Sequence, residues 1–515
     1  MTDLLLGQSY YLRFDPKLWE AMQPYPPLGT LYAASYAGSK GYTVALFDAM
    51  LAESEDEWAA ALDRYQPRFA CLFEDNFNYL SKMCLLRMRE AAFKMIVMAK
   101  ARGLPVILCG ADATDHADLY FQHGADYILL GEGELTLGEL LDSLTGRSSR
   151  PLDQILGLAH KTQGARHETQ AVSPEFGVWD GSAYASLTTG LEFGISRTAR
   201  RPDIRDLDAL PFPAWDLVDI PKYQRLWRER RGYYSMNLVT TRGCPYHCNW
   251  CAKPIWGQRY NSRSPENVVA EMKWLKEQYH PDHIWFADDI LGLKPGWIER
   301  FAGLLREADA VIPFKCLQRA DLVTDRVAAS LADAGCRTVW VGAESGSQKI
   351  LDAMDKGDTV QDIYNAAARL HARGIEVGFF LQFGYPGEDW DDIQLTLKMV
   401  RECMPDDIGI SVSYPLPGTR FYERVKMELG DKQNWTDSED LAMLYRGPYP
   451  TEFYRALHGR VHHEFRLRRA WHQHDWRGLA RAPYYLLGLL KTEARLRVIA
   501  RRSPPPTIST LPAGN

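Results

Sequence analysis

The chain has 515 residues, of which 46% are hydrophobic and 24% charged, and a formal net charge of −6. This composition excludes disordered, collagen-like and small disulfide-stapled proteins, and at roughly 100–200 residues per domain it predicts two to four globular domains. The nine cysteines cannot all pair with one another, which favours a reducing compartment. Met1–Phe14 lacks the pattern of a signal peptide and no apolar run approaches the ~20 residues of a membrane span, so we expect a cytoplasmic protein.

Residues 1–145 alternate short apolar runs with helical patterns. The runs that we expect to form strands are Tyr42–Asp48, Phe69–Phe73, Pro105–Gly110 and Tyr127–Leu130. A glycine-rich turn, Gly131–Glu134, then opens a helix that reaches Leu144. This order predicts an α/β fold, namely a doubly wound, Rossmann-like domain whose ligands lie beyond the carboxyl ends of its strands.

A second alternating block spans residues 233–435, after a predicted linker region at 146–232 that is rich in turn formers. Its expected strands are Leu238–Arg242, Ile284–Ala287, Phe314–Gln318, Thr338–Ala343, Glu376–Phe383 and Ile408–Tyr414. Amphipathic helical stretches separate these strands. Six strand-helix repeats predict a (βα)6 partial TIM barrel, in which the chemistry lies on the loops after the strands.

The C-terminal segment, residues 436–502, is basic and predicted to be helical. Between Thr451 and Arg502 there are 12 Lys and Arg against 4 Asp and Glu, so this stretch carries +8 and the rest of the chain −14. Two interpretations stay open: attachment to an anionic surface at the inner face of the membrane, or a helical cap whose Leu, Trp and Tyr face packs on the barrel. Nucleic-acid binding is not expected because the rest of the chain is acidic. Residues 503–515 are predicted to be a disordered tail.

Three cysteines follow the first strand of the second block as a C-x3-C-x2-C loop: Cys244, Cys248 and Cys251. Three thiolates on one short loop can hold three irons of a [4Fe-4S] cluster and leave the fourth iron open to a ligand. A zinc site with His247 as fourth ligand, or cysteines that only fill core space, are the alternatives. The other six cysteines are interpreted as small buried hydrophobic residues: Cys71, Cys84, Cys109, Cys316, Cys336 and Cys403.

The cysteine loop, preceded by Thr241-Arg242-Gly243, resembles that of the radical S-adenosylmethionine (radical SAM) superfamily. Four later segments resemble its cobalamin-binding class, which includes anaerobic magnesium-protoporphyrin monomethyl ester cyclases and radical C-methylases: Phe286–Asp289, Gly342–Ser347, Phe383–Glu388 and Tyr414–Thr419. The resemblance covers nearly all of residues 1 to about 430. It implies that the cluster, held by the three cysteines, binds S-adenosylmethionine and cleaves it to a 5'-deoxyadenosyl radical.

The resemblance also implies roles for residues at the mouth of the barrel. Trp250 would lie against the adenine, Glu344 would contact the ribose or amino group, and Asp288 would meet the methionine end of S-adenosylmethionine. Gly378 and Phe380 would line the adenine pocket. Ordinary structural roles stay open for three of them: Trp250 as packing, Glu344 as the cap of a helix near Ser347 and Asp288 as a turn residue.

The resemblance assigns cobalamin to the N-terminal domain, where Gly131 and Gly133 would accept the corrin ring or its nucleotide tail. The Asp-x-His-x-x-Gly motif that supplies a histidine below cobalt is absent, because neither His116 nor His123 has the required glycine spacing. We therefore expect cobalt without a histidine ligand. A vestigial domain that binds no cobalamin is the alternative.

Two reactions agree with this resemblance. One is C-methylation of an unactivated carbon through methylcobalamin, and the other is oxidative cyclisation or carbon-carbon rearrangement of a tetrapyrrole-like or lipid-like substrate. A non-catalytic cluster or zinc-binding sensor is the alternative outside the enzymes. The expected partners are a small-molecule or lipid-like substrate and a one-electron donor such as flavodoxin or ferredoxin.

Overall fold

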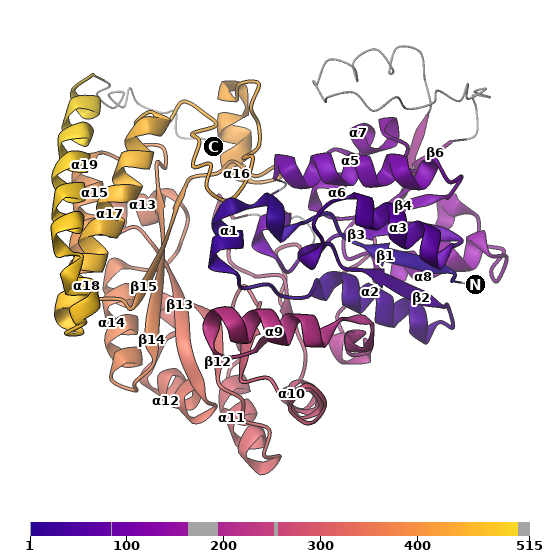
Figure 1. Cartoon of the computed structure of the whole chain (residues 1–515), viewed down its shortest axis with the longest axis horizontal. Helices are drawn as coiled ribbons and strands as arrows, with labels where there is room; N and C mark the ends of the chain where they lie inside the picture. The colour runs from indigo at the N-terminus through magenta and orange to yellow at the C-terminus, as the bar shows by residue number, and fades with distance from the viewer. Residues whose placement is uncertain (1, 84, 163–193, 252–255, 503–515) are drawn as a thin grey trace. The chain divides into compact units, whose positions relative to one another are not determined.

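The computed structural model describes residues 2–83, 85–162, 194–251 and 256–502, and the chain forms two compact units (Figure 1). The first unit comprises Met1–Phe14, Pro26–Ile204 and Leu210–Val218. The second comprises Asp15–Tyr25, Arg205–Ala209 and Asp219–Asn515. The predicted tail, residues 503–515, and Cys84 lie outside the described residues.

The first unit contains one seven-stranded sheet with the order β2-β1-β3-β4-β5-β6-β7. Its strands are β1 (Leu4–Gly7), β2 (Val44–Phe47), β3 (Phe69–Phe73), β4 (Val106–Cys109), β5 (Tyr127–Leu129), β6 (Leu158–Lys161) and β7 (Ile195–Arg197). The first five are parallel, whereas β6 and β7 add antiparallel strands from the stretch predicted as a linker. The predicted Rossmann-like fold is confirmed, and its strand order reverses between β1 and β3.

Helices cover both faces of this sheet. The longer ones are α2 (Leu28–Ser39), α3 (Asp56–Tyr65), α5 (Leu86–Lys100) and α8 (Glu134–Leu144). Alternate strand residues enter two separate cores: Leu5, for example, packs with α3 and α5 residues, and Leu6 with α2 and α8 residues. Because both faces are covered, the parallel strands are short apolar runs, which is why the sequence revealed β2 to β5. Strand β1 was not among the expected strands, although it is fully buried.

The second unit contains a six-stranded parallel sheet with the order β15-β14-β13-β12-β11-β8. Its strands are β8 (Ser235–Leu238), β11 (His283–Phe286), β12 (Phe314–Arg319), β13 (Cys336–Glu344), β14 (Glu376–Phe383) and β15 (Asp407–Val412). The helices between them are α10 (Pro265–Tyr279), α11 (Trp297–Glu307), α12 (Asp325–Asp333), α14 (Val360–His371) and α15 (Trp390–Cys403), with short α13 (Gln348–Ala353) before α14. The predicted partial barrel of six parallel strands is confirmed.

The helix α14 shows how local sequence produces these elements. Thr359 and Asp362 form a capping box at its N-terminus, which satisfies backbone groups that the first turn cannot pair internally. Ile363, Ala366 and Leu370 follow at intervals of three and four residues and are all buried. The helix therefore begins at a defined residue and turns one apolar face to the sheet.

The first strand of the barrel differs from its prediction. It spans Ser235–Leu238 instead of Leu238–Arg242, because Thr241–Arg242 form a separate strand, β9, that pairs antiparallel with β10 (Asn261–Ser262). This pairing was not foreseen, since β10 is only two residues long and has no apolar pattern.

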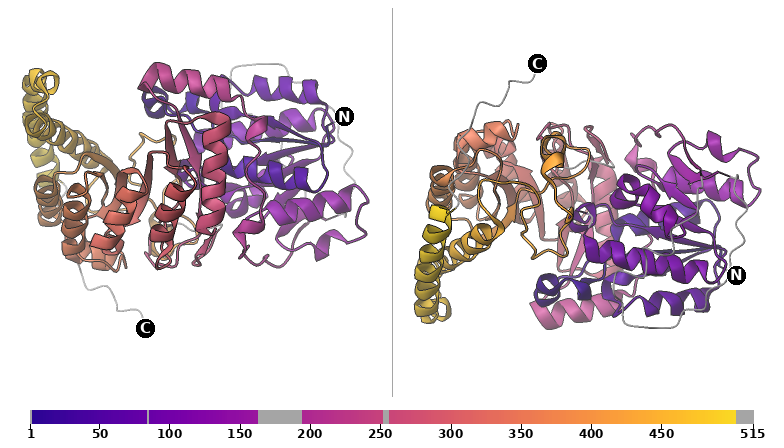
Figure 2. Two further views of the ribbon diagram at one scale, coloured as in Figure 1. Left: turned by 90° about the horizontal axis from the view of Figure 1, so that it is seen from below. Right: turned by 90° about the horizontal axis from the view of Figure 1, so that it is seen from above.

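The C-terminal segment is helical, as predicted. It consists of α17 (Thr451–His472), α18 (Trp476–Ala480) and α19 (Ala482–Arg502). Helices α17 and α19 form an antiparallel hairpin, and Figures 1 and 2 show α19, in yellow, as the outermost helix of the second unit. Among the described residues, no helix has the length and apolar character that crossing a membrane requires.

Candidate functional site

The segment that leads from β8 into the cysteine loop is fixed by Asp288, which follows β11. Asp288 Oδ1 accepts hydrogen bonds from the backbone N–H groups of Thr240, at 2.7 Å, and Thr241, at 2.8 Å. Both threonine hydroxyls also donate to the carboxylate, at 2.7 and 3.0 Å. Asp288 is buried, and this burial raises the pKa of its carboxyl group to about 6 although the hydrogen bonds oppose the change.

Gly243 turns the chain from β9 into the cysteine loop. Its φ is +79°, and a Cβ on it would lie 2.1 Å from the backbone oxygen of Arg259. No other residue type fits this turn without displacing the backbone of the loop. The first cysteine therefore follows a position that requires glycine both for conformation and for space.

The three cysteines lie on one loop, and none of them is in a disulfide bond. Cys244 is buried, whereas Cys248 and Cys251 are partly exposed. His247, the alternative zinc ligand, is exposed. In the described part of the chain, no three His, Cys, Asp or Glu side chains are close enough together to hold a single metal ion.

Asn249 holds the cysteine loop against the rest of the second unit. Its N–H donates to the Met354 carbonyl at 3.0 Å, and its side-chain amide donates to the Ala353 carbonyl at 2.8 Å. Tyr385, after β14, donates its hydroxyl to Asn249 Oδ1 at 2.8 Å. The neighbouring Trp250 packs against the apolar cluster that contains Met354 and Tyr385, and its indole N–H is buried without a hydrogen-bond partner among the described residues.

Arg319, the last residue of β12, joins the cysteine loop from the adjacent strand. Its guanidinium carbon lies 3.7 Å from the centroid of the Tyr246 ring, and Nη1 lies 3.8 Å from Cys248 Sγ. The same side chain donates to the Lys356 carbonyl at 2.8 Å and pairs with Asp321 at 3.0 Å. A buried cation therefore stands beside a predicted ligand of the cluster.

Glu344 ends β13 and pairs with the Lys356 ammonium at 3.0 Å, with both side chains buried. Its φ of +54° belongs to the left-handed region, and the β13–β14 register shifts between Gly342 and Glu344. Glu344 does not cap the helix α13, whose N-cap is Ser347. Nearby, both oxygens of buried Asp358 lack hydrogen-bond partners among the described residues, and burial raises the pKa of this carboxyl group to about 6.

Gly378 and Phe380 lie on β14, on the face opposite to buried Val377 and Phe379. A Cβ on Gly378 would lie 2.5 Å from the Trp340 ring, so glycine makes room for this indole. The Trp340 and Phe380 rings stack with centroids 4.7 Å apart. The stacked Trp340 and Phe380 rings thus lie on the strand face to which the resemblance assigned the adenine pocket.

The first unit brings the loops after β1 and β3 together at the point where the strand order reverses. Ser9 donates its N–H and hydroxyl to the buried Glu74 carboxylate, and burial raises the pKa of Glu74 to about 7. The side-chain oxygen of Asn76 is buried and accepts no hydrogen bond from the described residues. After β5, a Cβ on Gly131 would meet no atom within 4 Å, whereas one on Gly133 would lie 2.5 Å from Cys109 Sγ. Gly133 therefore serves close packing, and Gly131 faces open space.

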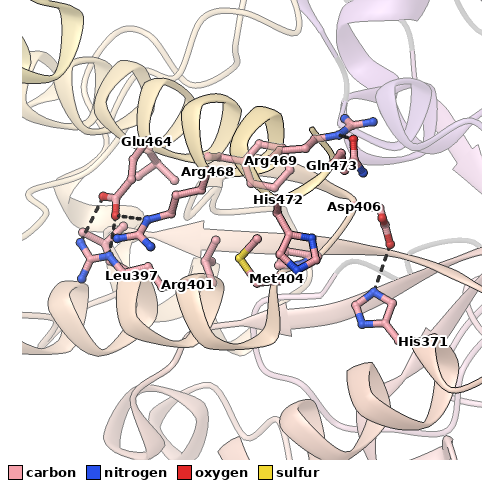
Figure 3. A pocket seen from close by; sticks show the side chains of 14 residues that line it. His371, Leu397, Arg401, Met404, Asp406, Glu464, Arg468, Arg469, His472 and Gln473 are labelled. Atoms are coloured by element: carbon pink, nitrogen blue, oxygen red, sulfur yellow. Dashed lines mark hydrogen bonds and ion pairs between the residues drawn. The ribbon is translucent and has the colours of Figure 1, made fainter. Parts of the chain in front are cut away.

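A cavity of about 330 Å³ in the second unit contains none of the predicted site residues (Figure 3). It lies between α15 and α17 and extends to His371, at the end of α14, and to Asp406, just before β15. These positions mark the amino-terminal edge of the sheet, whereas the cysteine loop, Arg319 and Glu344 belong to the carboxyl-terminal edge. The cavity is thus separate from the candidate site.

Sequence reasoning missed Arg319, Lys356 and Asn249 as residues of this site. Asn249 stands within the cysteine motif, but no pattern shows that its side chain holds the loop. Arg319 is the last residue of β12, which adjoins β11. Its place at the carboxyl end of a barrel strand was the signal that could have identified it as a site residue.

Residues 238–400 match the family model of the radical SAM superfamily. The chain is 28% identical over 300 residues to an uncharacterized methyltransferase of Pyrococcus horikoshii, an alignment that covers 58% of this chain and 57% of that protein. It is 24% identical to the cytidylyl-2-hydroxyethylphosphonate methyltransferase of Streptomyces wedmorensis, over 82% of this chain and 80% of that one. It is also 24% identical to the anaerobic magnesium-protoporphyrin IX monomethyl ester cyclase of Rubrivivax gelatinosus, over 81% of this chain and 68% of that protein.

Among solved structures, the cobalamin-dependent S-adenosylmethionine radical enzyme OxsB matches with a TM-score of 0.68 and 15% identity, over 98% of this chain and 75% of that one. At this identity the likeness establishes the fold. Residues 238–400 therefore belong to the radical SAM superfamily, and the fold of the chain, a half-barrel with an N-terminal Rossmann-like unit, is similar to that of OxsB.

Proposed function

We propose that the protein is a cobalamin-dependent radical SAM enzyme that methylates an unactivated carbon of a small-molecule or lipid-like substrate. One observation carries this proposal: the similarity to the Streptomyces methyltransferase extends over 82% of this chain, and so is not confined to the barrel. The similarity to the Pyrococcus methyltransferase supports the same reaction class.

The donor set at the barrel mouth fits a [4Fe-4S] cluster. Cys244, Cys248 and Cys251 would hold three irons, and no protein ligand is needed for the fourth. Arg319 supplies positive charge beside Cys248, and Asn249 fixes the loop by five hydrogen bonds to its surroundings. When bound, the cluster supplies the electron that cleaves S-adenosylmethionine to a 5'-deoxyadenosyl radical.

Cobalamin would lie at the carboxyl ends of the parallel strands of the first unit, where ligands of doubly wound sheets usually bind. The buried Asn76 side-chain oxygen has no partner among the described residues, and Gly131 faces open space. The proposed cobalt would have no histidine ligand from the loops directly after β1 and β3, because these loops contain no histidine. Cobalamin, when bound there, supplies a transferable methyl group.

Oxidative cyclisation is the second candidate reaction, because the similarity to the Rubrivivax cyclase covers 81% of this chain. Either reaction draws electrons from outside the chain, for which we propose a flavodoxin or ferredoxin. The two reactions differ in their products from S-adenosylmethionine. A methylase makes S-adenosylhomocysteine and 5'-deoxyadenosine, whereas a cyclase makes only 5'-deoxyadenosine.

The test is anaerobic reconstitution of the full chain with iron, sulfide and hydroxocobalamin, followed by incubation with S-adenosylmethionine and a chemical reductant. We expect the desalted protein to retain iron and corrin absorbance and to form both products. Cys248→Ala should abolish cleavage, whereas Cys403→Ala, at a buried core cysteine, should preserve it. Retained corrin with 5'-deoxyadenosine alone would favour cyclisation, and bound zinc without cleavage would favour a sensor.

A further inference from the structure

Helix α19 uses one face to pack against α17. Tyr485 and Leu496 are buried on this face, and Arg460 of α17 pairs with Glu493 at 2.7 Å. The His463 ring of α17 lies 5.5 Å from the Tyr484 ring. The hairpin is therefore a packed element, and the orientation of α19 about its own axis is fixed.

The opposite face of α19 is apolar and exposed. Leu487, Leu490, Ala494 and Val498 follow one another at intervals of three or four residues, so they share one side of the helix. Leu487 is 67% and Leu490 is 71% exposed. Of the fifteen large hydrophobic residues that are exposed in the described chain, seven lie between 471 and 498, so they are concentrated on the hairpin: Trp471, Trp476, Tyr484, Leu486, Leu487, Leu490 and Val498.

Basic residues surround this apolar face. Lys491, Arg495 and Arg497 are exposed on α19, and Arg477 and Arg481 are exposed just before it. The one acidic residue of α19, Glu493, is already paired with Arg460 and Arg497. The exposed surface of α19 thus has an apolar centre and a cationic rim. A helical cap that faces only water does not need such an apolar centre.

Helix α17 connects this surface firmly to the half-barrel. Glu464 of α17 pairs with Arg401 of α15 and with Arg468 of its own helix (Figure 3). It also pairs with Arg460 of α17. Phe465 and Val461 are buried on the same side of α17. A partner bound to α19 would therefore be coupled to the second unit as a whole.

We infer that the α17–α19 hairpin docks on an anionic lipid bilayer, with the apolar face of α19 lying in the headgroup region. Leucine and aromatic side chains between lysines and arginines are the pattern of helices that lie in a membrane interface, where tryptophan and tyrosine are also enriched. The +8 charge of residues 451–502 complements anionic headgroups. A second copy of this chain would bring two cationic rims together, so charge complementarity favours the bilayer.

Vesicle flotation tests this inference with the full chain. Vesicles of phosphatidylglycerol and phosphatidylcholine in equal parts should carry the protein upward in a density gradient, whereas pure phosphatidylcholine should carry much less. The Leu487→Glu/Leu490→Glu variant should bind at least tenfold more weakly. The matched control is Met427→Glu, at an apolar residue that is 90% exposed outside the hairpin, and it should bind like the unmodified protein.

Four outcomes would overturn the inference. The first three are no flotation with either vesicle, equal flotation with both lipid compositions, and flotation of the double variant equal to that of the unmodified protein. The fourth is loss of binding in a chain that ends at Arg502, which would assign the binding to residues 503–515. If the double variant instead turns a dimer into a monomer without any vesicle binding, the face is an interface between copies. Unchanged far-ultraviolet circular dichroism of the double variant shows that its loss of binding is not unfolding.

Discussion

Asp288→Ala should loosen the backbone that leads into the cysteine loop. The substitution removes four accepted hydrogen bonds and leaves the buried N–H groups of Thr240 and Thr241 without an acceptor. An unsatisfied buried donor costs about 1–3 kcal/mol, so two give a local loss of about 2–6 kcal/mol. Since about 1.4 kcal/mol is a factor of ten, amide exchange at Thr240 and Thr241 should accelerate by about one to four orders of magnitude.

Hydrogen exchange followed by mass spectrometry on peptides that cover Thr240 and Thr241 measures this effect. Asp288→Asn keeps an acceptor oxygen and should show a smaller acceleration. Asp289→Ala, at the exposed neighbour, is the matched control and should leave these amides unchanged. If Asp288→Ala leaves the exchange rates unchanged and only weakens binding of S-adenosylmethionine, the Asp288 carboxylate does not hold the Thr240–Thr241 backbone. It would then contact S-adenosylmethionine.

Three further substitutions have definite expectations. Gly243→Ala should lower iron content after reconstitution, because its Cβ would lie 2.1 Å from a backbone oxygen, whereas Gly418→Ala, with a similar φ of +77° and open space, should not. Burial lowers the pKa of Lys315 from 10.5 to about 8, so the unfolded chain holds this proton more tightly than the folded one. The free energy of unfolding should therefore rise by about 3 kcal/mol as the pH increases from 8 to 10.5. Urea unfolding of Lys315→Met at both pH values should show no such rise. Arg319→Gln removes the positive charge beside Cys248 and should lower the midpoint potential of the cluster in a redox titration followed by electron paramagnetic resonance. Arg319→Lys keeps the charge and should restore part of the potential. An unchanged potential in Arg319→Gln would show that this cation does not tune the cluster.

The sequence predicted the six strands of the half-barrel and four strands of the first sheet, β2 to β5, because such strands stand out as apolar runs. It missed β1, β6 and β7 of the first sheet. It also placed Asp288, Glu344 and the cysteine loop at one edge, since each follows a strand of a parallel sheet. The direction of each side chain could not be predicted. Asp288 turns back to the Thr240–Thr241 backbone, and Glu344 turns to Lys356 after a register shift that no residue pattern announces.

The contacts of Arg319 show why the remaining part of the site was out of reach. Cys248 is 71 positions earlier and the Lys356 carbonyl 37 positions later, so the residues meet only through the order of the strands. Arg319 and Lys356 are two buried cations that face two buried carboxylates, Glu344 and Asp358. Deprotonated cysteines would add negative charge to this balanced group, and removing one member of a buried charge network leaves the others uncompensated. We therefore expect Arg319 and Lys356 to offset the charge of the thiolates in the proposed cluster site. Their loss should affect cluster binding before it affects the fold.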